Sequence, residues 1–221
     1  MNELDALAIK YGTDKSTKHN GYTPFYEKEF GPIRDSVTSV LEIGVYKGWS
    51  MRMWKDWFKN AQIIGIDNLQ EVPVLAAMEE MKKEGFQFFI GNQADPTFIC
   101  SVAAQIGHQL DIIIDDGGHK MSQQLVSFLN LWPVIKPGGT YVIEDLFTSY
   151  HGEFKDQEPT MIEILKGLVD DVNCHGFNYN GFLFTSKDRK ILPNDYEKTI
   201  ESMTFYKAIT FIRKKNAAPL S

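Results

Sequence analysis

The stretch LEIGVYKG at residues 41–48 decides the fold class of this chain. It closes an apolar run that predicts a β-strand over residues 37–45, and its two glycines place a tight turn after that strand. Open α/β sheets bind their ligands at the carboxyl ends of the strands, where glycine lets the backbone approach a ligand closely. The stretch therefore predicts the first strand of an α/β sheet with a ligand site at its end.

From this strand onward, short runs rich in valine and isoleucine alternate with segments of helical periodicity, which is typical of a parallel sheet built from βαβ units. Further strands are predicted at residues 62–67, 86–90, 110–115 and 140–144, with terminal strand structure at 202–213. Helices are predicted at residues 49–58, 72–84, 122–135 and 160–172, and another begins at Pro96 with Asp95 as its cap. The sequence KPGG at 136–139 is predicted to end the helix before the fifth strand.

The composition indicates one globular domain, since 221 residues with 43% hydrophobic and 24% charged side chains can bury a sizeable core. Residues 1–35 are predicted as a helical N-terminal extension and residues 36–215 as the main domain. The net charge of −6 argues against nucleic acid and anionic membranes as partners. With two cysteines and no apolar run of about 18 residues, we expect a reducing compartment and a cytoplasmic protein.

An acidic residue closes the second predicted strand. Asp67 follows Gly44 by about 20 residues, the interval at which a carboxylate can accept hydrogen bonds from ribose hydroxyls. The spacing lacks the third glycine that packs a helix under a pyrophosphate, so a nucleoside without phosphates fits better than a dinucleotide. The alternative is that the glycines form only a tight turn and Asp67 caps a helix.

Two further strands end in carboxylates. Asp115 and Asp116 precede Gly-Gly-His119, and Glu144 and Asp145 close the fifth strand. Like charges at one sheet edge need a counter-charge, and a divalent cation with oxygen ligands supplies it, with magnesium favoured and manganese acceptable. The imidazole of His119 could then act as a general base toward a hydroxyl held by the cation. The alternative is that the aspartates cap the next helix and His119 lies in a solvated loop.

These motifs resemble a known family. The pattern from Glu42 to Gly48 is similar to the first motif of class I S-adenosylmethionine-dependent methyltransferases. Together with YGTDK at 11–15, IDDGGH at 114–119 and VIEDLFTSY at 142–150, it resembles the macrolide sugar O-methyltransferase family of the mycinamicin type over most of the chain. The resemblance implies a Rossmann-like α/β fold, with a mostly parallel seven-stranded sheet flanked by helices.

The resemblance also implies site residues. It makes Asp116, Glu144 and Asp145 the magnesium ligands and His119 the base. For the cofactor it implies Glu42 and Gly44 near the methionine portion, Asp67 at the ribose and Gln93 or Asp95 near the adenine. Tyr11, Lys15 and Asp115 are also expected to bind the cofactor. The N-terminal extension would act as a lid that folds over the cofactor or acceptor through Asp14, Lys15, His19 and Tyr22. Three positions depart from the family pattern, because Asn92, Ala94 and Gly118 stand in place of aspartate, serine and serine.

The implied activity is a metal-dependent O-methyltransferase that moves a methyl group from S-adenosylmethionine to a hydroxyl of a small molecule, with a sugar or glycosylated natural product expected. Three other classes stay open: a nicotinamide-dependent oxidoreductase, a metal-dependent hydrolase or hydroxylase, and a non-catalytic cofactor-binding module. The oligomeric state is also open, with a homo-oligomer as one option. At least two of Trp49, Trp54 and Trp57 are expected in the core, and residues 178–184 are a candidate acceptor-side loop.

Overall fold

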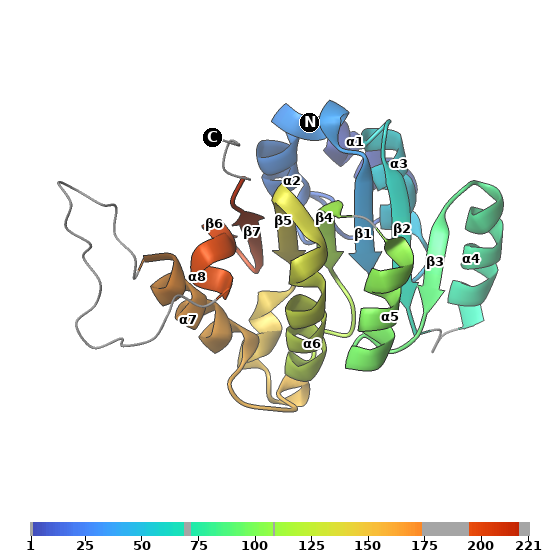
Figure 1. Ribbon diagram of the computed structural model, residues 1–221. Helices are drawn as coiled ribbons and strands as arrows, with labels where there is room; N and C mark the ends of the chain where they lie inside the picture. Colours follow the sequence, from blue (N-terminus) through green and yellow to red (C-terminus); the bar gives the residue numbers. More distant parts are fainter. Residues whose placement is uncertain (1, 69–71, 108, 174–194, 217–221) are drawn as a thin grey trace, which may run out of the picture.

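The computed structural model describes residues 2–68, 72–107, 109–173 and 195–216, and its centre is a seven-stranded sheet with strand order β3-β2-β1-β4-β5-β7-β6 (Figure 1). The strands are β1 Ser39–Ile43, β2 Gln62–Asp67, β3 Gln87–Ile90, β4 Leu110–Asp115, β5 Ile135–Ile143, β6 Ile200–Tyr206 and β7 Ile209–Lys214. β1 to β5 are parallel, and β7 is antiparallel to both β5 and β6. The predicted mostly parallel seven-stranded sheet is confirmed.

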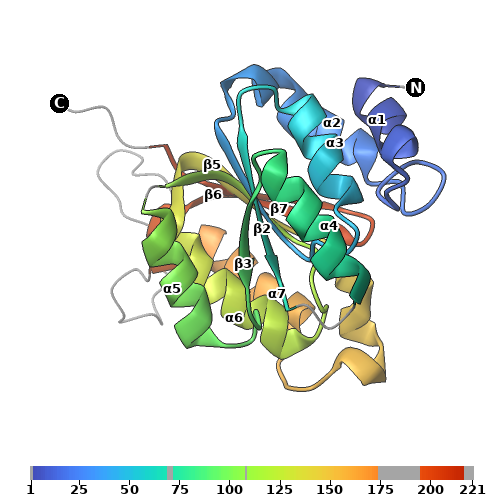
Figure 2. The same ribbon diagram turned by 90° about the vertical axis from the view of Figure 1, so that its right-hand side faces the viewer.

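Helices cover both faces of the sheet (Figure 2). They are α1 Glu3–Tyr11, α2 Thr23–Phe30, α3 Trp49–Trp57, α4 Val72–Lys83, α5 Pro96–Ile106, α6 Met121–Leu131, α7 Met161–Asn173 and α8 Asp195–Thr199. Short 3-10 turns lie at Gly31–Ser36, Trp132–Val134, Leu146–Tyr150 and Gly152–Phe154. Side chains of α1 to α4 pack on one face and those of α5 to α7 on the other, which gives two apolar layers with the sheet between them.

The predicted elements agree with the structure except around the fifth strand. The structure ends α6 at Leu131 and starts β5 at Ile135, so the KPGG sequence lies inside the strand and does not separate helix from strand. The extra residues that KPGG adds to β5 are accommodated by a register shift against β4. Leu110 of β4 pairs with Ile135, whereas Ile112 pairs with Thr140. The helix stops earlier because Pro133, inside the 3-10 turn Trp132–Val134, has no amide hydrogen to continue the helical hydrogen bonds.

The sequence also made predictions about a helix cap, the tryptophans and a loop, and these can be compared with the structure. Asp95 caps α5 as predicted, since its side chain accepts a hydrogen bond from the amide of Thr97 at 2.9 Å. Trp54 and Trp57 are buried in the core, as expected for at least two of the three tryptophans. The candidate loop at 178–184 lies outside the described residues. In the described part of the chain, no helix has both the length and the apolar character needed to cross a membrane.

The strand order creates one position where a ligand site is expected. The chain runs outward from β1 to β2 and β3, then crosses back to place β4 on the other side of β1. At this switch point the connections leave β1 and β4 in opposite directions and open a crevice at their carboxyl ends. The register pairs Ile43 with Asp115, so Gly44 and Asp116 follow their strands side by side.

Candidate active site

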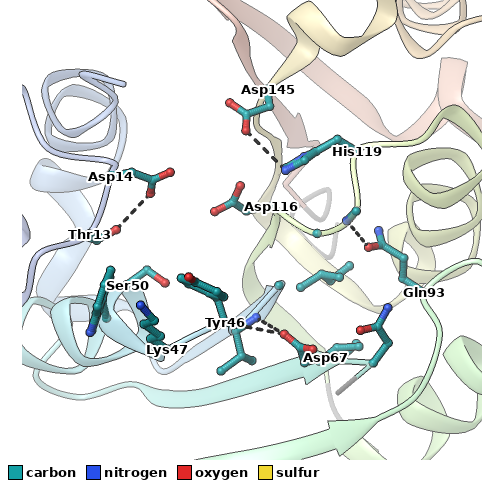
Figure 3. A pocket seen from close by; sticks show the side chains of 18 of the residues that line it. Thr13, Asp14, Tyr46, Lys47, Ser50, Asp67, Gln93, Asp116, His119 and Asp145 are labelled. Atoms are coloured by element: carbon teal, nitrogen blue, oxygen red, sulfur yellow. Dashed lines mark hydrogen bonds and ion pairs between the residues drawn. The ribbon is translucent and has the colours of Figure 1, made fainter. Parts of the chain in front are cut away.

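A cavity of about 560 Å³ lies at this switch point (Figure 3). Its wall is built from the turns after β1, β2, β3, β4 and β5, together with residues of the loop between α1 and α2. Among the residues predicted for the site, Gly44, Asp67, Gln93, Asp116, His119 and Asp145 line the cavity. The structure therefore brings together residues that are spread over about half of the chain.

Gly44 is required by the close approach of two turns. Its φ of +93° is in the region that favours glycine, and a Cβ at this position would lie 2.0 Å from the carbonyl oxygen of Asp116. The amide of Asp116 donates to the carbonyl of Ile43 at 3.0 Å, which fixes the turns after β1 and β4 to each other. Any side chain at Gly44 would push these turns apart.

Asp67 holds the turn after β1 in place. Its Oδ2 accepts hydrogen bonds from the backbone amides of Val45 at 2.8 Å and Tyr46 at 3.1 Å. Because Asp67 also lines the cavity, one carboxylate both shapes the turn and faces the space where a ligand would lie. Asn68 continues the same wall.

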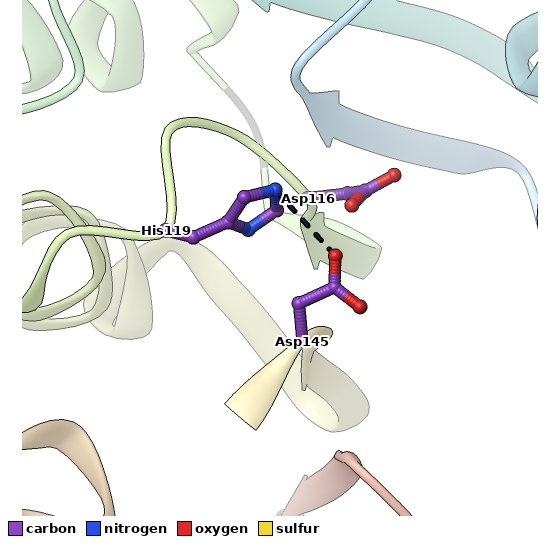
Figure 4. A group of neighbouring side chains, drawn as sticks. All are labelled: Asp116, His119 and Asp145. Carbon is purple, nitrogen blue, oxygen red and sulfur yellow. Dashed lines mark ion pairs between the residues drawn. The ribbon is translucent and has the colours of Figure 1, made fainter. Parts of the chain in front are cut away.

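Asp116, His119 and Asp145 form a compact group on the cavity wall (Figure 4). Each offers one potential metal-ligand atom, and these atoms all lie within 4.8 Å of one another. Nε2 of His119 is 3.5 Å from Oδ2 of Asp145, while Tyr22 donates its hydroxyl to Oδ1 of Asp145 at 2.5 Å. Nδ1 of His119 is buried and has no hydrogen-bond partner within the described residues. The predicted base and two of the predicted metal ligands thus share one corner of the cavity.

Lys15 lies among buried carboxylates behind this corner. Its side chain is fully buried, and its Nζ lies 2.8 and 2.9 Å from the two carboxylate oxygens of Glu144 and 3.6 Å from Oε1 of Glu42. The ammonium also contacts Asp116, and Tyr26 donates its hydroxyl to Glu144. Burial lowers the pKa of Lys15, but the attraction of Asp116 and Glu144 outweighs burial and leaves this pKa well above its usual value. Lys15 therefore supplies part of the positive charge that, from the sequence, was expected to come from a metal ion alone.

Glu42, Asp115 and Glu144 are buried and do not line the cavity. Glu42 accepts hydrogen bonds from Oγ of Ser50 at 2.8 Å and from Nε1 of Trp54 at 3.1 Å. Burial raises the pKa of Glu42 to about 7 and that of Asp115 also to about 7. Burial and the nearby Asp116 carboxylate raise the pKa of Glu144 well above its usual value. These three carboxyl groups support the cavity wall from behind, and direct ligand contacts by them stay predictions.

Gln93 positions the turn after β4. Its Oε1 accepts from the amide of Gly118 at 2.8 Å, and its Nε2 donates to Oδ1 of Asp115 at 3.1 Å and to Oγ of Ser127 at 3.2 Å. A Cβ on Gly117 would lie 1.9 Å from the same Oε1. The amide of Gln93 is therefore engaged by the protein, although the residue borders the cavity as predicted.

Two residues expected near the cofactor lie elsewhere in the structure. The hydroxyl of Tyr11 donates to Oδ2 of Asp56 at 2.5 Å, and Asp95 is exposed at the start of α5. Neither residue is among those that line the cavity. Their contact with a cofactor stays a prediction.

Backbone strain gathers at the same cavity. Tyr46, His119 and Asp145 have φ angles of +47°, +59° and +54°, which non-glycine residues rarely adopt. In the described chain only Ala208 shares this feature among non-glycine residues, and the other three line the cavity. Strained residues persist where the surrounding structure holds them, and they cluster at functional sites.

The aromatic part of the cavity wall was not predicted from the sequence. Tyr46 and Trp49 line the cavity with their rings in edge contact, and the ammonium of Lys47 lies 5.0 and 4.7 Å from the two ring centres. Trp49 and Ser50 form the first turn of α3. The place of Trp49 and Ser50 in the sequence, directly after the glycine turn, could have predicted that they line the cavity. The first helical turn after the first strand faces the ligand in such sheets.

Comparison with known proteins shows which domain and which proteins this chain is similar to. Residues 41–146 match a family model described as a methyltransferase domain. The chain is 34% identical to 8-demethyl-8-alpha-L-rhamnosyl tetracenomycin-C 2'-O-methyltransferase of Streptomyces olivaceus, over 96% of this chain and 54% of that protein. It is 32% identical to mycinamicin VI 2''-O-methyltransferase of Micromonospora griseorubida, over 96% of this chain and 52% of that protein.

A solved structure is also similar to this chain over nearly its whole length. The MycE methyltransferase from the mycinamycin biosynthetic pathway, in complex with Mg and SAH, matches with a TM-score of 0.82 and 30% identity, over 97% of this chain and 54% of that chain. This chain spans about half the length of the curated relatives described above. The strand order and the match of residues 41–146 to a methyltransferase domain agree with the resemblance to class I S-adenosylmethionine-dependent methyltransferases. Within that class, the chain resembles the macrolide sugar O-methyltransferases of the mycinamicin type.

Proposed function

We propose that this protein transfers a methyl group from S-adenosylmethionine to a sugar hydroxyl of a glycosylated small molecule, with the help of a divalent cation. The single observation that carries the proposal is the group of Asp116, His119 and Asp145, which lies within one cavity with Gly44 and Asp67. A nucleoside-binding turn and a cation-binding corner are thus combined on one sheet edge. The family match favours this reading over the oxidoreductase and hydrolase alternatives.

The residues on the cavity wall fit a nucleoside cofactor. The carboxylate of Asp67 stands at the end of β2, where it can accept hydrogen bonds from ribose hydroxyls. Gly44 keeps the neighbouring backbone free of side-chain bulk, and Gly91 does the same at the end of β3. A Cβ on Gly91 would meet the ring of Phe98 at 2.5 Å, so this turn is also built around glycine.

The corner also fits a hard cation. Asp116 and Asp145 supply carboxylate oxygens, which magnesium prefers, and both carboxylates are partly accessible from the cavity, with side-chain exposures of 19% and 14%. In our proposal Asp116 and Asp145 hold the cation, and Glu144, which is buried beside Lys15, stays a predicted third ligand. A bound divalent cation would lower the pKa of a hydroxyl that it contacts.

His119 is the proposed base. Its ring lies beside Asp145, and its backbone is fixed in a left-handed conformation by the turn after β4. A neutral imidazole can accept the proton of an acceptor hydroxyl, and the oxygen then forms a bond to the methyl carbon as the bond from carbon to sulfur breaks. Bringing the two reactants together at the correct angle accounts for much of the rate gain, roughly 7–11 kcal/mol.

The acceptor class comes from the relatives. Two of them are named for methylation of a sugar 2'- or 2''-hydroxyl on a tetracenomycin or a mycinamicin. The described residues that line the cavity form no basic patch for nucleic acid, and the chain carries a net charge of −6. We infer a glycoside without anionic groups as the acceptor.

The test is transfer of a labelled methyl group to panels of glycosides and catechols, in chelator and after addition of magnesium. We expect label on glycosides, loss of transfer in chelator and recovery with magnesium. Full activity in chelator would reject the cation site. Catechol methylation without glycoside methylation would reject the acceptor class.

A further inference from the structure

The carboxylate of Asp14 stands apart from the other acids of the cavity. Four aspartates line the cavity: Asp14, Asp67, Asp116 and Asp145. Asp67 is engaged by the turn after β1, and Asp116 and Asp145 belong to the corner with His119. Asp14 comes from a different element, the loop between α1 and α2, which the family resemblance places over the cofactor or the acceptor without naming the group that Asp14 would contact.

Asp14 is held in place by polar neighbours. Nδ2 of Asn20 donates to its Oδ2 at 3.2 Å, and the hydroxyl of Thr13 lies 3.5 Å from its Oδ1. Among the described residues, no lysine or arginine forms an ion pair with Asp14, whereas the neighbouring Lys15 is committed to other carboxylates. Asp14 is also exposed, so its carboxylate is accessible from the cavity and, within the described residues, is not taken up by a lysine or arginine.

The loop that carries Asp14 is firmly anchored. The buried Asp5 accepts hydrogen bonds from the amide of Thr17 at 2.8 Å and from the hydroxyl of Thr23 at 2.7 Å. The carbonyl of Lys15 accepts from the amides of Tyr22 and Thr23 at 2.9 and 3.1 Å. Asp14 is therefore positioned by the folded loop, so a ligand that binds it need not order the loop first.

The position of Asp14 matches one end of the proposed cofactor. Figure 3 shows Asp14 and Asp67 on opposite sides of the cavity, with the carboxylate of Asp14 directed into it. If Asp67 binds the ribose, the amino-acid end of the cofactor extends away from it past Gly44. That end carries an ammonium group, which needs an anionic acceptor.

Glu42 is the acid expected at this end, and the structure gives it other partners. Its side chain is fully buried, accepts from Ser50 and Trp54, and lies 3.6 Å from the ammonium of Lys15. We propose that Asp14, from the N-terminal extension, binds the ammonium group of the cofactor's methionine portion in place of Glu42. This inference rests on the proposed function, because it requires S-adenosylmethionine in the cavity.

Calorimetric titration of wild type and Asp14→Asn tests the proposal, with S-adenosylhomocysteine and its deamino analogue as ligands. The analogue keeps the nucleoside, the sulfur and the carboxylate but lacks the ammonium group. We expect Asp14→Asn to weaken S-adenosylhomocysteine binding about 5- to 20-fold, because a charge-assisted hydrogen bond is lost. The same variant should bind the analogue as well as wild type does, or better.

Asp67→Asn is the control variant for this titration. Asp67→Asn should weaken both ligands by a similar factor, because both carry the ribose. Unchanged binding of S-adenosylhomocysteine to Asp14→Asn, or an equal loss for both ligands, would overturn the role of Asp14. Failure of wild type to bind S-adenosylhomocysteine would instead overturn the proposed function.

Discussion

Lys15 and Glu144 form a buried ion pair between residues 129 positions apart in the sequence, with the ammonium within 2.9 Å of both carboxylate oxygens. The pair joins the N-terminal loop to the end of β5, directly beside the corner of Asp116, His119 and Asp145. The N-terminal extension is therefore tied into the site by charge as well as by apolar packing of α1 and α2 on the sheet.

Replacement of Lys15 by methionine should destabilise the fold strongly. Methionine fills a similar volume but leaves Glu144, Asp116 and Glu42 without their buried cation, and breaking a buried pair in this way costs about 3–5 kcal/mol. Urea unfolding of the metal-free protein at pH 7.5 measures the loss. Lys18→Met, at an exposed position of the same loop, should change the free energy of unfolding by less than about 0.5 kcal/mol. Equal stability of the two variants would contradict the ion-pair role.

Glu42 should make stability depend on pH in a defined window. Burial raises its pKa in the folded state to about 7 from the usual value of 4.5, so between these values the folded state holds a proton that the unfolded state has lost. Relative to Glu42→Gln, the unfolding free energy of wild type should therefore fall as pH rises from 4.5 to 7, by on the order of 3 kcal/mol. Groups such as Asp115 titrate in both proteins and cancel in the difference. A difference that stays constant across this range would show that Glu42 is ionised throughout.

Much of the fold follows from local sequence signals. β2 and β4 have the predicted bounds, because apolar runs end in aspartate at Asp67 and Asp115 and change periodicity there. The prediction from the KPGG sequence was wrong, since proline and glycine end helices but are also accommodated where a strand carries a register shift. Local propensity does not distinguish these two cases.

The candidate site could be predicted in part. Gly44, Asp67, Asp116, His119 and Asp145 could be predicted because each lies at the end of a strand or in the turn after it, and parallel strands bring their carboxyl ends to one edge. The burial of Lys15 could not be predicted in this way. Its ammonium reaches Glu144 through the packing of α1 and α2 on the sheet, and long-range packing leaves no periodic signal in the sequence.

Replacement of Gly44 by alanine should disrupt the site through a backbone clash. The new Cβ would lie 2.0 Å from the carbonyl oxygen of Asp116, so the turns after β1 and β4 would have to separate. Gly21→Ala separates this effect from backbone strain, because Gly21 has a φ of +72° but no atom within 4 Å of a built Cβ. We expect Gly21→Ala to lose about 1–2 kcal/mol of stability and to retain S-adenosylhomocysteine binding. Gly44→Ala should lose that binding at least about 10-fold, and similar behaviour of the two variants would argue against the clash.

His119→Asn should separate catalysis from cofactor binding. Asparagine tolerates the left-handed backbone conformation at this position, where φ is +59°, so the turn after β4 should keep its shape. Without the imidazole the acceptor hydroxyl has no base, and turnover should fall about 10²- to 10⁴-fold. Calorimetry should still find S-adenosylhomocysteine binding within about 2-fold of wild type, because the group at Gly44 and Asp67 is untouched. His151→Asn, at an exposed imidazole on the segment after Asp145, is the control and should keep its turnover. Loss of cofactor binding with turnover preserved in His119→Asn would assign His119 to the cofactor and leave the base to another residue.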